Sequence, residues 1–365
     1  MRLGVAAALV GGVYRPGDVQ VDGDTGRVTA VGLAGPGRGI AVPGFVDLQV
    51  NGFAGVDFLT ADVEAHREAA VALARTGVLA HQPTLITSAP DQTASAIATA
   101  DKARSSLSVG SRVLGVHLEG PFLSPRKRGT HPVDLLRAPD VDLMRRLLAA
   151  GRITQVTLAP ELPGALDVVD LCVAAGIAVS CGHSYATAAE AHAAFDRGAR
   201  LVTHLFDAMR PFTHRDPGIV GAALTRDDVT LGLIADPSHL SPEAVQLAFR
   251  AGPDRVVLVT DALAAGGCGD GHFQLGAVEF DVSGGVARKP DGTLVGTTST
   301  LVEAVQHACV SGVPLEEAVN AATRTPARFF PQDDIGLLLP GDRADVVVLD
   351  DSLDLRAVYQ HGLPL

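Results

Sequence analysis

Four short stretches decide the fold of this chain: GVHLEGP (115–121), VSCGHS (179–184), LVTHLFDAM (201–209) and VVLVTDA (256–262). Each is an apolar run that ends in a carboxylate or an imidazole, namely Glu119, His183, His204 and Asp261. Continuous apolar runs are typical of strands that are buried on both faces of a parallel sheet. In a barrel of alternating strands and helices, reactive groups gather at the carboxyl ends of the strands. The stretches therefore predict a barrel with one reactive site at its mouth.

The same pattern continues on both sides of these stretches. Ala-rich helical segments such as VEAHREAAVALARTG (63–77) separate the apolar runs. We predict an α/β fold, a (β/α)8 TIM-like barrel over residues 43–333. A Gly-rich stretch with alternating apolar residues predicts a β-hairpin insertion around 270–297, near the mouth. The eight predicted strands lie in GFVDLQV (44–50), VLAHQPTLI (78–86), VLGVHLE (113–119), ITQVTLAPE (153–161), AVSCGHS (178–184), LVTHLFD (201–207), LGLIADPSH (231–239) and VVLVTDA (256–262).

The two ends of the chain carry short strand-like pieces broken by Gly and Pro. Residues 1–42 and 334–365 both show this pattern. A few short strands are marginally stable alone, so we expect the two ends to form one small β-sandwich domain together.

Composition limits the function classes. The formal net charge of -12 over 365 residues argues against a nucleic-acid surface, which needs clustered Lys and Arg. No apolar run approaches the roughly 20 residues of a membrane span, and the run from Leu3 to Val10 is predicted as a first strand rather than a signal segment. Four scattered cysteines without CxxC spacing indicate reduced thiols and a cytoplasmic protein.

The three residues Glu119, His183 and His204 form the predicted metal site. One carboxylate and two imidazoles with an open fourth position describe a catalytic zinc-type centre, which activates water and polarises a carbonyl. Strand alternation also predicts a layer beneath them, with His117 below Glu119, Cys181 below His183 and Val202 below His204. We expect His117 and Cys181 to be barrel filler.

Asp261 ends the eighth run and is predicted to face the metal across the mouth. A carboxylate there can take a proton from the attacking water and pass it to a leaving amine. The structural alternative is a helix cap, because Asp often serves that role where a strand leads into a helix.

The motifs PGFVDLQVNGFAGVDF, QPTLITS, GVHLEGPFLSPRKRGTHP, CGHSYA, THLFDAM, RDPGIVG, ADPSHL, LVTDA and DGTLVGTTSTL, taken together, resemble the N-acetylglucosamine-6-phosphate deacetylases of the amidohydrolase superfamily. The resemblance runs nearly end to end. It implies hydrolysis of the N-acetyl group of N-acetyl-D-glucosamine 6-phosphate in amino-sugar catabolism. It also implies that Glu119, His183 and His204 hold the metal and that Asp261 is the general base and acid.

The resemblance further implies the substrate contacts. His131 would touch the acetyl carbonyl, with Thr130 beside it, and the backbone of Asp207 and Ala208 would bind the sugar phosphate. Arg215 and His239 would bind it as well and could reach into a neighbouring subunit's pocket, which implies a homodimer.

Gln49 and Asn51 stand where many amidohydrolases have His-x-His for a second metal. Neutral amides are poor ligands for a transition metal, so we expect one divalent ion per subunit, Zn first and Fe, Co or Mn as alternatives.

Asp207 departs from the family motif, which usually has Asn there. Its carboxylate would repel a phosphate, so it is neutralised by Arg215, points away, or reports another substrate. The alternatives are a deacetylase of N-acetylgalactosamine 6-phosphate or of an unphosphorylated N-acetylhexosamine, and an inactive amidohydrolase-like scaffold. The basic run PRKRG (125–129) is predicted as a solvated loop that, as part of a lid, could guide an anion.

Overall fold

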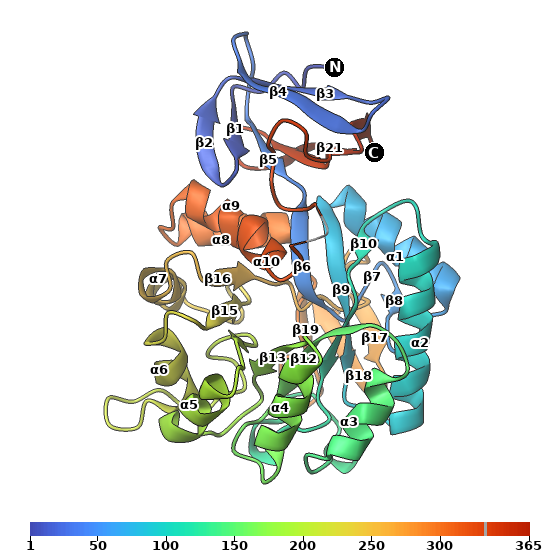
Figure 1. Ribbon diagram of the computed structural model, residues 1–365, viewed down its shortest axis with the longest axis vertical. Helices are drawn as coiled ribbons and strands as arrows, with labels where there is room; N and C mark the ends of the chain where they lie inside the picture. The colour runs from blue at the N-terminus through green and yellow to red at the C-terminus, as the bar shows by residue number, and fades with distance from the viewer. Residues whose placement is uncertain (332–333) are drawn as a thin grey trace.

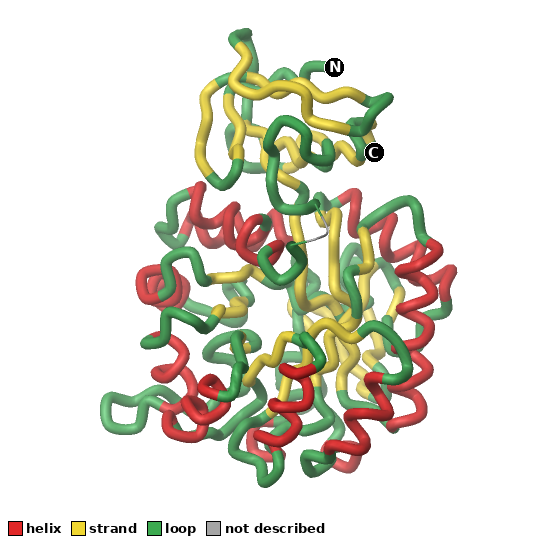
Figure 2. Tube along the Cα trace, in the orientation of Figure 1, coloured by secondary structure: helices red, strands yellow, loops and turns green. Residues whose placement is uncertain are grey.

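The computed structural model describes residues 1–331 and 334–365. Figure 1 shows two parts, a small upper part that holds both termini and a larger part below it. Figure 2 shows the upper part as strands and loops, whereas helices surround the strands of the larger part. The larger part is the barrel.

Eight parallel strands form the barrel, in the order β6, β9, β11, β12, β13, β14, β15, β16, with the short β10 also paired to β9. Between β16 and β6 the wall is closed by a bridge from Val50 to Ala262 and by the Asp261 N–H, which donates to the Gln49 carbonyl. The predicted (β/α)8 fold with a separate strand domain is confirmed. The eight barrel strands in the described ranges are β6 (Phe45–Val50), β9 (Val78–Ile86), β11 (Val116–Glu119), β12 (Ile153–Leu158), β13 (Ala178–Cys181), β14 (Leu201–Val202), β15 (Thr230–Leu233) and β16 (Val256–Leu258), and the additional strand is β10 (Arg112–Val113).

Helices cover the outside of the barrel because one face of each is apolar and packs on the strands. Several begin at sequence-encoded caps: Asp62 accepts from the Ala65 N–H, and Thr187 and Thr300 each form a capping box with a Glu three residues later. No helix in the described ranges is long and apolar enough to cross a membrane. The helices are α1 (Val63–Arg75), α2 (Pro90–Ser106), α3 (Val141–Leu148), α4 (Ala165–Ala174), α5 (Ala188–Asp196), α6 (Gly218–Leu224), α7 (Pro242–Ala251), α8 (Leu301–Val310), α9 (Leu315–Ala322) and α10 (Arg324–Ala327), with short 3-10 turns at Pro125–Lys127 and Val133–Leu135.

The small domain joins the two ends of the chain. Strand β5 (Ile40–Pro43) pairs with β20 (Val346–Leu349), so that Ile40 lies opposite Leu349. Residues from both ends, such as Val5, Val21, Leu338 and Val346, share one apolar cluster. The six-stranded sheet runs β2 (Val13–Pro16), β1 (Ala7–Val10), β5, β20, β21 (Leu355–Gln360), β22 (Leu363–Pro364), beside the pair β3 (Asp18–Asp22) and β4 (Arg27–Leu33).

Two smaller strand groups lie on the barrel. The pair β7 (Gly52–Phe53) and β8 (Val56–Asp57) follows β6, and an antiparallel sheet of β17 (Gly271–Leu275), β18 (Val278–Ser283) and β19 (Val286–Arg288) follows β16. The second group lies where the hairpin insertion was expected.

The barrel interior corrects one expectation about alternation. The hydroxyls of Thr157 on β12 and Thr203 after β14 are 2.7 Å apart although β13 lies between their strands, so both point inward. The inward positions are therefore Ser180 on β13 and Gly182 just after it, and Cys181 points outward, on the side of the strand that α4 covers. Cys181 does not lie below His183, and by the same parity Val202 does not lie below His204. His117 does lie below Glu119, as predicted.

Candidate metal centre

Three ligand residues leave the strands at the mouth of the barrel. Glu119 is the last residue of β11, whereas His183 and His204 each follow their strands by two positions. Both histidines have positive φ angles, 46° and 32°, which is the left-handed region that a non-Gly residue seldom adopts. This local turn breaks the strand alternation and brings both imidazoles inward, although their parity alone would point them to the helices.

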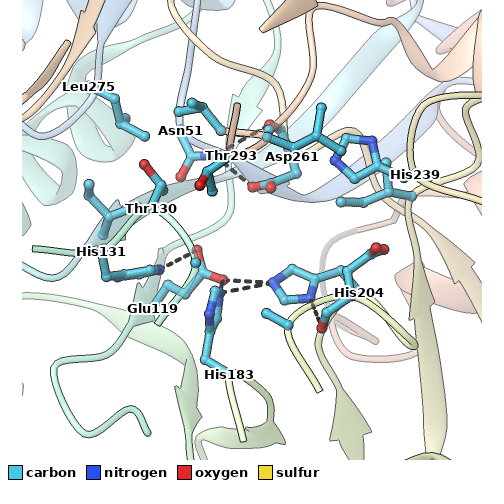
Figure 3. A pocket seen from close by; sticks show the side chains of 18 of the residues that line it. Asn51, Glu119, Thr130, His131, His183, His204, His239, Asp261, Leu275 and Thr293 are labelled. Carbon is cyan, nitrogen blue, oxygen red and sulfur yellow. Dashed lines mark hydrogen bonds and ion pairs between the residues drawn. The ribbon is translucent and has the colours of Figure 1, made fainter. Parts of the chain in front are cut away.

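The ligand atoms of these residues converge on one point (Figure 3). The Nε2 atoms of His183 and His204 lie 3.0 and 3.1 Å from Glu119 Oε1, and 3.1 Å from each other. The three ligand atoms, one from each residue, lie within 4.8 Å of one another, and all three side chains are buried. The predicted metal ligands are therefore brought together by the fold.

The other ring nitrogen of each histidine is held by a backbone carbonyl. His183 Nδ1 donates to the Lys127 carbonyl at 2.8 Å, and His204 Nδ1 donates to the Asp207 carbonyl at 3.2 Å. These bonds fix the tautomer that leaves the Nε2 lone pair free, which is how metal-binding histidines are usually oriented. Two imidazole lone pairs and a carboxylate facing each other at about 3 Å fit a divalent cation.

The electrostatics of the cluster also favour positive charge. Burial opposes a charge on His204, yet the hydrogen bond and the negative charge of Glu119 raise its pKa to about 9. Burial opposes the charge of Glu119 as well, but the two histidines hold its pKa well below the usual range. The site thus keeps an anionic ligand in a buried place, where a cation compensates it.

Asp261 lies across the mouth from the cluster. Asn51 Nδ2 donates to its Oδ1 at 2.7 Å and Gln49 Nε2 donates to the same atom at 3.0 Å. Burial raises the pKa of Asp261 to about 7, and the nearby charge of Glu119 adds to that rise. The helix-cap alternative is not observed, because α8 begins only at Leu301 and is capped by Thr300.

His131 presents a neutral imidazole to the site. Its Nδ1 accepts the Thr87 N–H at 3.2 Å, so the proton of the neutral ring is on Nε2, which lies 3.9 Å from Glu119 Oε2. Burial lowers the pKa of His131 to about 3. The ring can therefore donate one hydrogen bond, as a group that polarises a carbonyl must.

These residues line a cavity of about 490 Å³. Three buried polar atoms on its lining residues have no partner in the described part of the chain: Asn51 Oδ1, Thr130 Oγ1 and Asp207 Oδ2. Unpaired buried polar atoms are rare in proteins and indicate a place for a ligand or water. The predicted site residues Thr130, His131, Asp207, Ala208 and His239 all line this cavity.

One end of the cavity combines Ala208, Asp207 and His239. Burial opposes charge on His239 and Asp236, but their 2.9 Å hydrogen bond raises the pKa of His239 and lowers that of Asp236. Asp207 N–H donates to the His204 carbonyl at 2.9 Å, whereas Ala208 N–H has no partner among the described residues. Burial raises the pKa of Asp207 to about 6.

Arg215 is not part of this cavity within a single chain. It is exposed on the loop before α6, and it makes no ion pair with Asp207 among the described residues. The neighbouring Asp216 pairs with Arg210 instead. Neutralisation of Asp207 by Arg215 of the same chain is therefore not observed.

The sequence did not assign several lining residues. Arg126 and Lys127 from PRKRG line the cavity, as do Arg288, Leu275 and Thr293 from the inserted strands and the loop after them. The basic run was the only signal for the first two. Gln49 and Asn51 were noticed as missing ligands, and the structure shows them as the hydrogen-bond donors that hold Asp261.

Comparison with known proteins agrees with this geometry. Residues 40–362 match the Amidohydrolase family. N-acetylglucosamine-6-phosphate deacetylase of Bos taurus is 42% identical over 339 residues, which cover 88% of this chain and 82% of the relative. N-acetylgalactosamine-6-phosphate deacetylase of Escherichia coli O157:H7 is 36% identical over 324 residues, covering 88% and 86%. A mutant N-acetyl-D-glucosamine-6-phosphate deacetylase from Mycobacterium smegmatis, solved in complex with N-acetyl-D-glucosamine-6-phosphate, superposes with a TM-score of 0.93 at 35% identity, over 100% of this chain and 98% of that chain.

Proposed function

This chain belongs to the amidohydrolase family and, within it, to the N-acetylglucosamine-6-phosphate deacetylases, and from that membership we propose that it hydrolyses N-acetyl-D-glucosamine 6-phosphate to glucosamine 6-phosphate and acetate in amino-sugar catabolism. The observation that carries the proposal is the convergence of Glu119, His183 and His204 opposite Asp261, beside a neutral His131. This set contains the groups that amide hydrolysis requires, so an inactive scaffold is disfavoured.

Glu119, His183 and His204 would hold one divalent metal, and we propose Zn, with Fe, Co or Mn as alternatives. Such an ion, when bound, polarises a carbonyl and lowers the pKa of a water ligand. Gln49 and Asn51 donate to Asp261 through their amide nitrogens, an arrangement that supports a single ion per subunit.

The remaining steps are performed by the side chains of this chain. Asp261 accepts the proton of the attacking water and returns it to the nitrogen of the leaving amine. His131 Nε2–H donates to the acetyl oxygen, where negative charge develops in the transition state. Since the pKa of Asp261 is raised to about 7, its carboxylate can both accept and release a proton near neutral pH.

The sugar phosphate would occupy the end of the cavity formed by Ala208 and His239. A free Ala208 N–H and a His239 with a raised pKa are suitable anion donors. Thr130 would bind the sugar near His131. Arg215 is exposed and does not line its own cavity, so we propose that it reaches the cavity of a neighbouring subunit in a cytoplasmic homodimer.

A second candidate substrate has specific support. The Escherichia coli relative is named for the galactosamine epimer, and the carboxylate of Asp207, whose buried Oδ2 has no partner in the described part of the chain, suits a nearby sugar hydroxyl better than a phosphate. A deacetylase of N-acetylgalactosamine 6-phosphate or of an unphosphorylated N-acetylhexosamine therefore remains the alternative.

Acetate release from the two phosphorylated epimers and from free N-acetylglucosamine tests the substrate. Asp261→Asn tests the mechanism: it should keep the metal, measured by elemental analysis, and lose most turnover. Near wild-type kcat in Asp261→Asn would show that another group is the base.

A further inference from the structure

Asp47 is a fully buried carboxyl group on β6. It forms no ion pair with any residue in the described part of the chain. Burial raises its pKa to about 7. A buried carboxyl is costly unless hydrogen bonds satisfy it, so its three partners need an explanation.

All three partners donate to Asp47, and two of them belong to one residue. Oδ1 accepts the Thr260 N–H and the Gln49 N–H, both at 3.2 Å, and Oδ2 accepts the Thr260 hydroxyl at 2.6 Å. The ionised form of Asp47 only accepts hydrogen bonds, so in that form the Thr260 hydroxyl donates to it. The lone pairs of the Thr260 hydroxyl are then free to accept the Ala262 N–H at 3.1 Å. The same hydroxyl lies 3.3 Å from the Gln49 carbonyl.

These hydrogen bonds join Thr260 and Ala262, the two residues that flank Asp261 in the chain. Asp261 has a positive φ of 51°, a conformation that costs a non-Gly residue on the order of 1 kcal/mol and persists only where neighbours impose it. Its own N–H donates to the Gln49 carbonyl at 2.9 Å, and its carbonyl accepts the Thr297 N–H at 3.1 Å. The Thr297 hydroxyl also donates to the Thr260 carbonyl at 2.7 Å.

The location of these bonds is the seam of the barrel. Between β6 and β16 the regular ladder is reduced to the bridge of Val50 with Ala262 and a few backbone bonds beside it. The side chains of Asp47 and Thr260 add hydrogen bonds to this short seam.

We propose that Asp47 is a positioning residue for the reaction: acting through Thr260, it imposes the left-handed backbone conformation that aims the Asp261 carboxylate into the cavity. Asp47 touches no ligand of the cavity, since it does not line it. The proposal rests on the proposed role of Asp261 as the proton acceptor.

Two variants and one matched control test the proposal. Thr260→Val removes the hydroxyl at nearly constant shape, Asp47→Asn replaces one acceptor oxygen by a donor, and Thr260→Ser keeps the hydroxyl. We expect Thr260→Val and Asp47→Asn to lower kcat roughly 10- to 100-fold, because small misplacements of a reacting group cost that much. KM should stay within about twofold, one metal should remain per chain, and Thr260→Ser should restore most of kcat. Steady-state acetate release, elemental analysis and the Tm of each variant provide the readouts.

Wild-type kcat in folded Thr260→Val and Asp47→Asn would overturn the proposal, as would a Thr260→Ser variant as impaired as Thr260→Val. If the first two variants do not fold, Thr297→Val decides, because it loosens the same peptide without leaving Asp47 unpaired. It should lower kcat several-fold at unchanged KM, and unchanged kcat would sink the idea. An active Asp261→Asn would instead refute the proposed base, whatever the Asp47 variants show.

Discussion

The barrel interior contains two neighbouring polar layers that differ in one respect, the kind of partner that their histidines meet. In the lower layer, His117 is bonded at both nitrogens, to Thr84 at 3.2 Å and to Thr157 at 2.7 Å. In the upper layer, at the mouth, His204 donates from Nδ1 to a backbone carbonyl, and its Nε2 lies 3.1 Å from both Glu119 Oε1 and His183 Nε2. Both histidines are buried, so burial does not distinguish them.

The pKa values of the two histidines move in opposite directions. Burial lowers the pKa of His117 to about 4, because hydroxyl partners do not compensate a charge. Burial also opposes a charge on His204, but Glu119 raises its pKa to about 9. A buried histidine whose two nitrogens are bonded to neutral hydroxyls is therefore part of the core, whereas one whose Nε2 faces a carboxylate and another imidazole marks a site.

The largest expected effect is the difference in metal binding and activity between a substitution of His204 and one of His117. His204→Ala should abolish metal binding and reduce kcat/KM by roughly a thousandfold or more, since it removes one of the three proposed ligands. His117→Gln should retain the metal and most activity, because an amide can still donate to one threonine and accept from the other. Elemental analysis and acetate release measure both, with one divalent ion per chain expected for wild type.

The comparison would fail if His117→Gln lost the metal as His204→Ala does. Two tightly bound ions in the wild-type chain would likewise contradict the single site, because the amides of Gln49 and Asn51 would then have to serve a second ion.

The residues of the upper layer could be predicted from the sequence more accurately than those of the lower layer. Apolar runs that end in Glu119, His183 and His204 locate the strand ends, and parallel strands bring those ends together whatever the local geometry. The path by which the histidines reach the mouth could not be predicted, because a positive φ at a histidine has no sequence signature. Strict alternation therefore placed Cys181 and Val202 on the wrong face of the wall.

Contacts between residues far apart in the chain were equally out of reach. Lys127 acts through its carbonyl, which every residue has, and Gln49 acts by donating to Asp261 from a position 212 residues earlier in the chain. The small domain was easier to predict, because short strands at both ends of one chain cannot be stable separately.

A second prediction concerns Arg215 and Asp207 and the charge of the ligand that they would meet. If the ligand carries a 6-phosphate, Arg215→Ala should raise KM for the phosphorylated sugar roughly 10- to 100-fold, the size of a charge-assisted hydrogen bond, and leave KM for the unphosphorylated sugar unchanged. Asp207→Asn removes a negative charge at similar size, and it should raise kcat/KM for the phosphorylated sugar several-fold. Steady-state kinetics with both sugars measure the two variants.

The opposite pattern would change the substrate. A wild-type preference for the unphosphorylated sugar, weakened in Asp207→Asn, would identify the unpaired Oδ2 as a selectivity element and refute the phosphate.

The smallest expected effect is the pH dependence that His117, in the lower layer, gives to the free energy of unfolding. His117 has a folded-state pKa of about 4, against about 6.5 in an unfolded chain. Between these values the unfolded state binds more protons than the folded state, so this residue's contribution to stability is complete above about pH 6.5 and is lost as pH falls through 4. The glutamine of the His117→Gln variant cannot titrate, so the difference in unfolding free energy between wild type and variant should shrink on acidification, by on the order of 2 kcal/mol from pH 7.5 to 4.5.

Urea unfolding at both pH values measures this difference. The other buried histidines titrate equally in both proteins, so their contributions cancel. A difference that stays constant with pH would mean that burial does not hold His117 neutral, and the two layers would then not differ as argued.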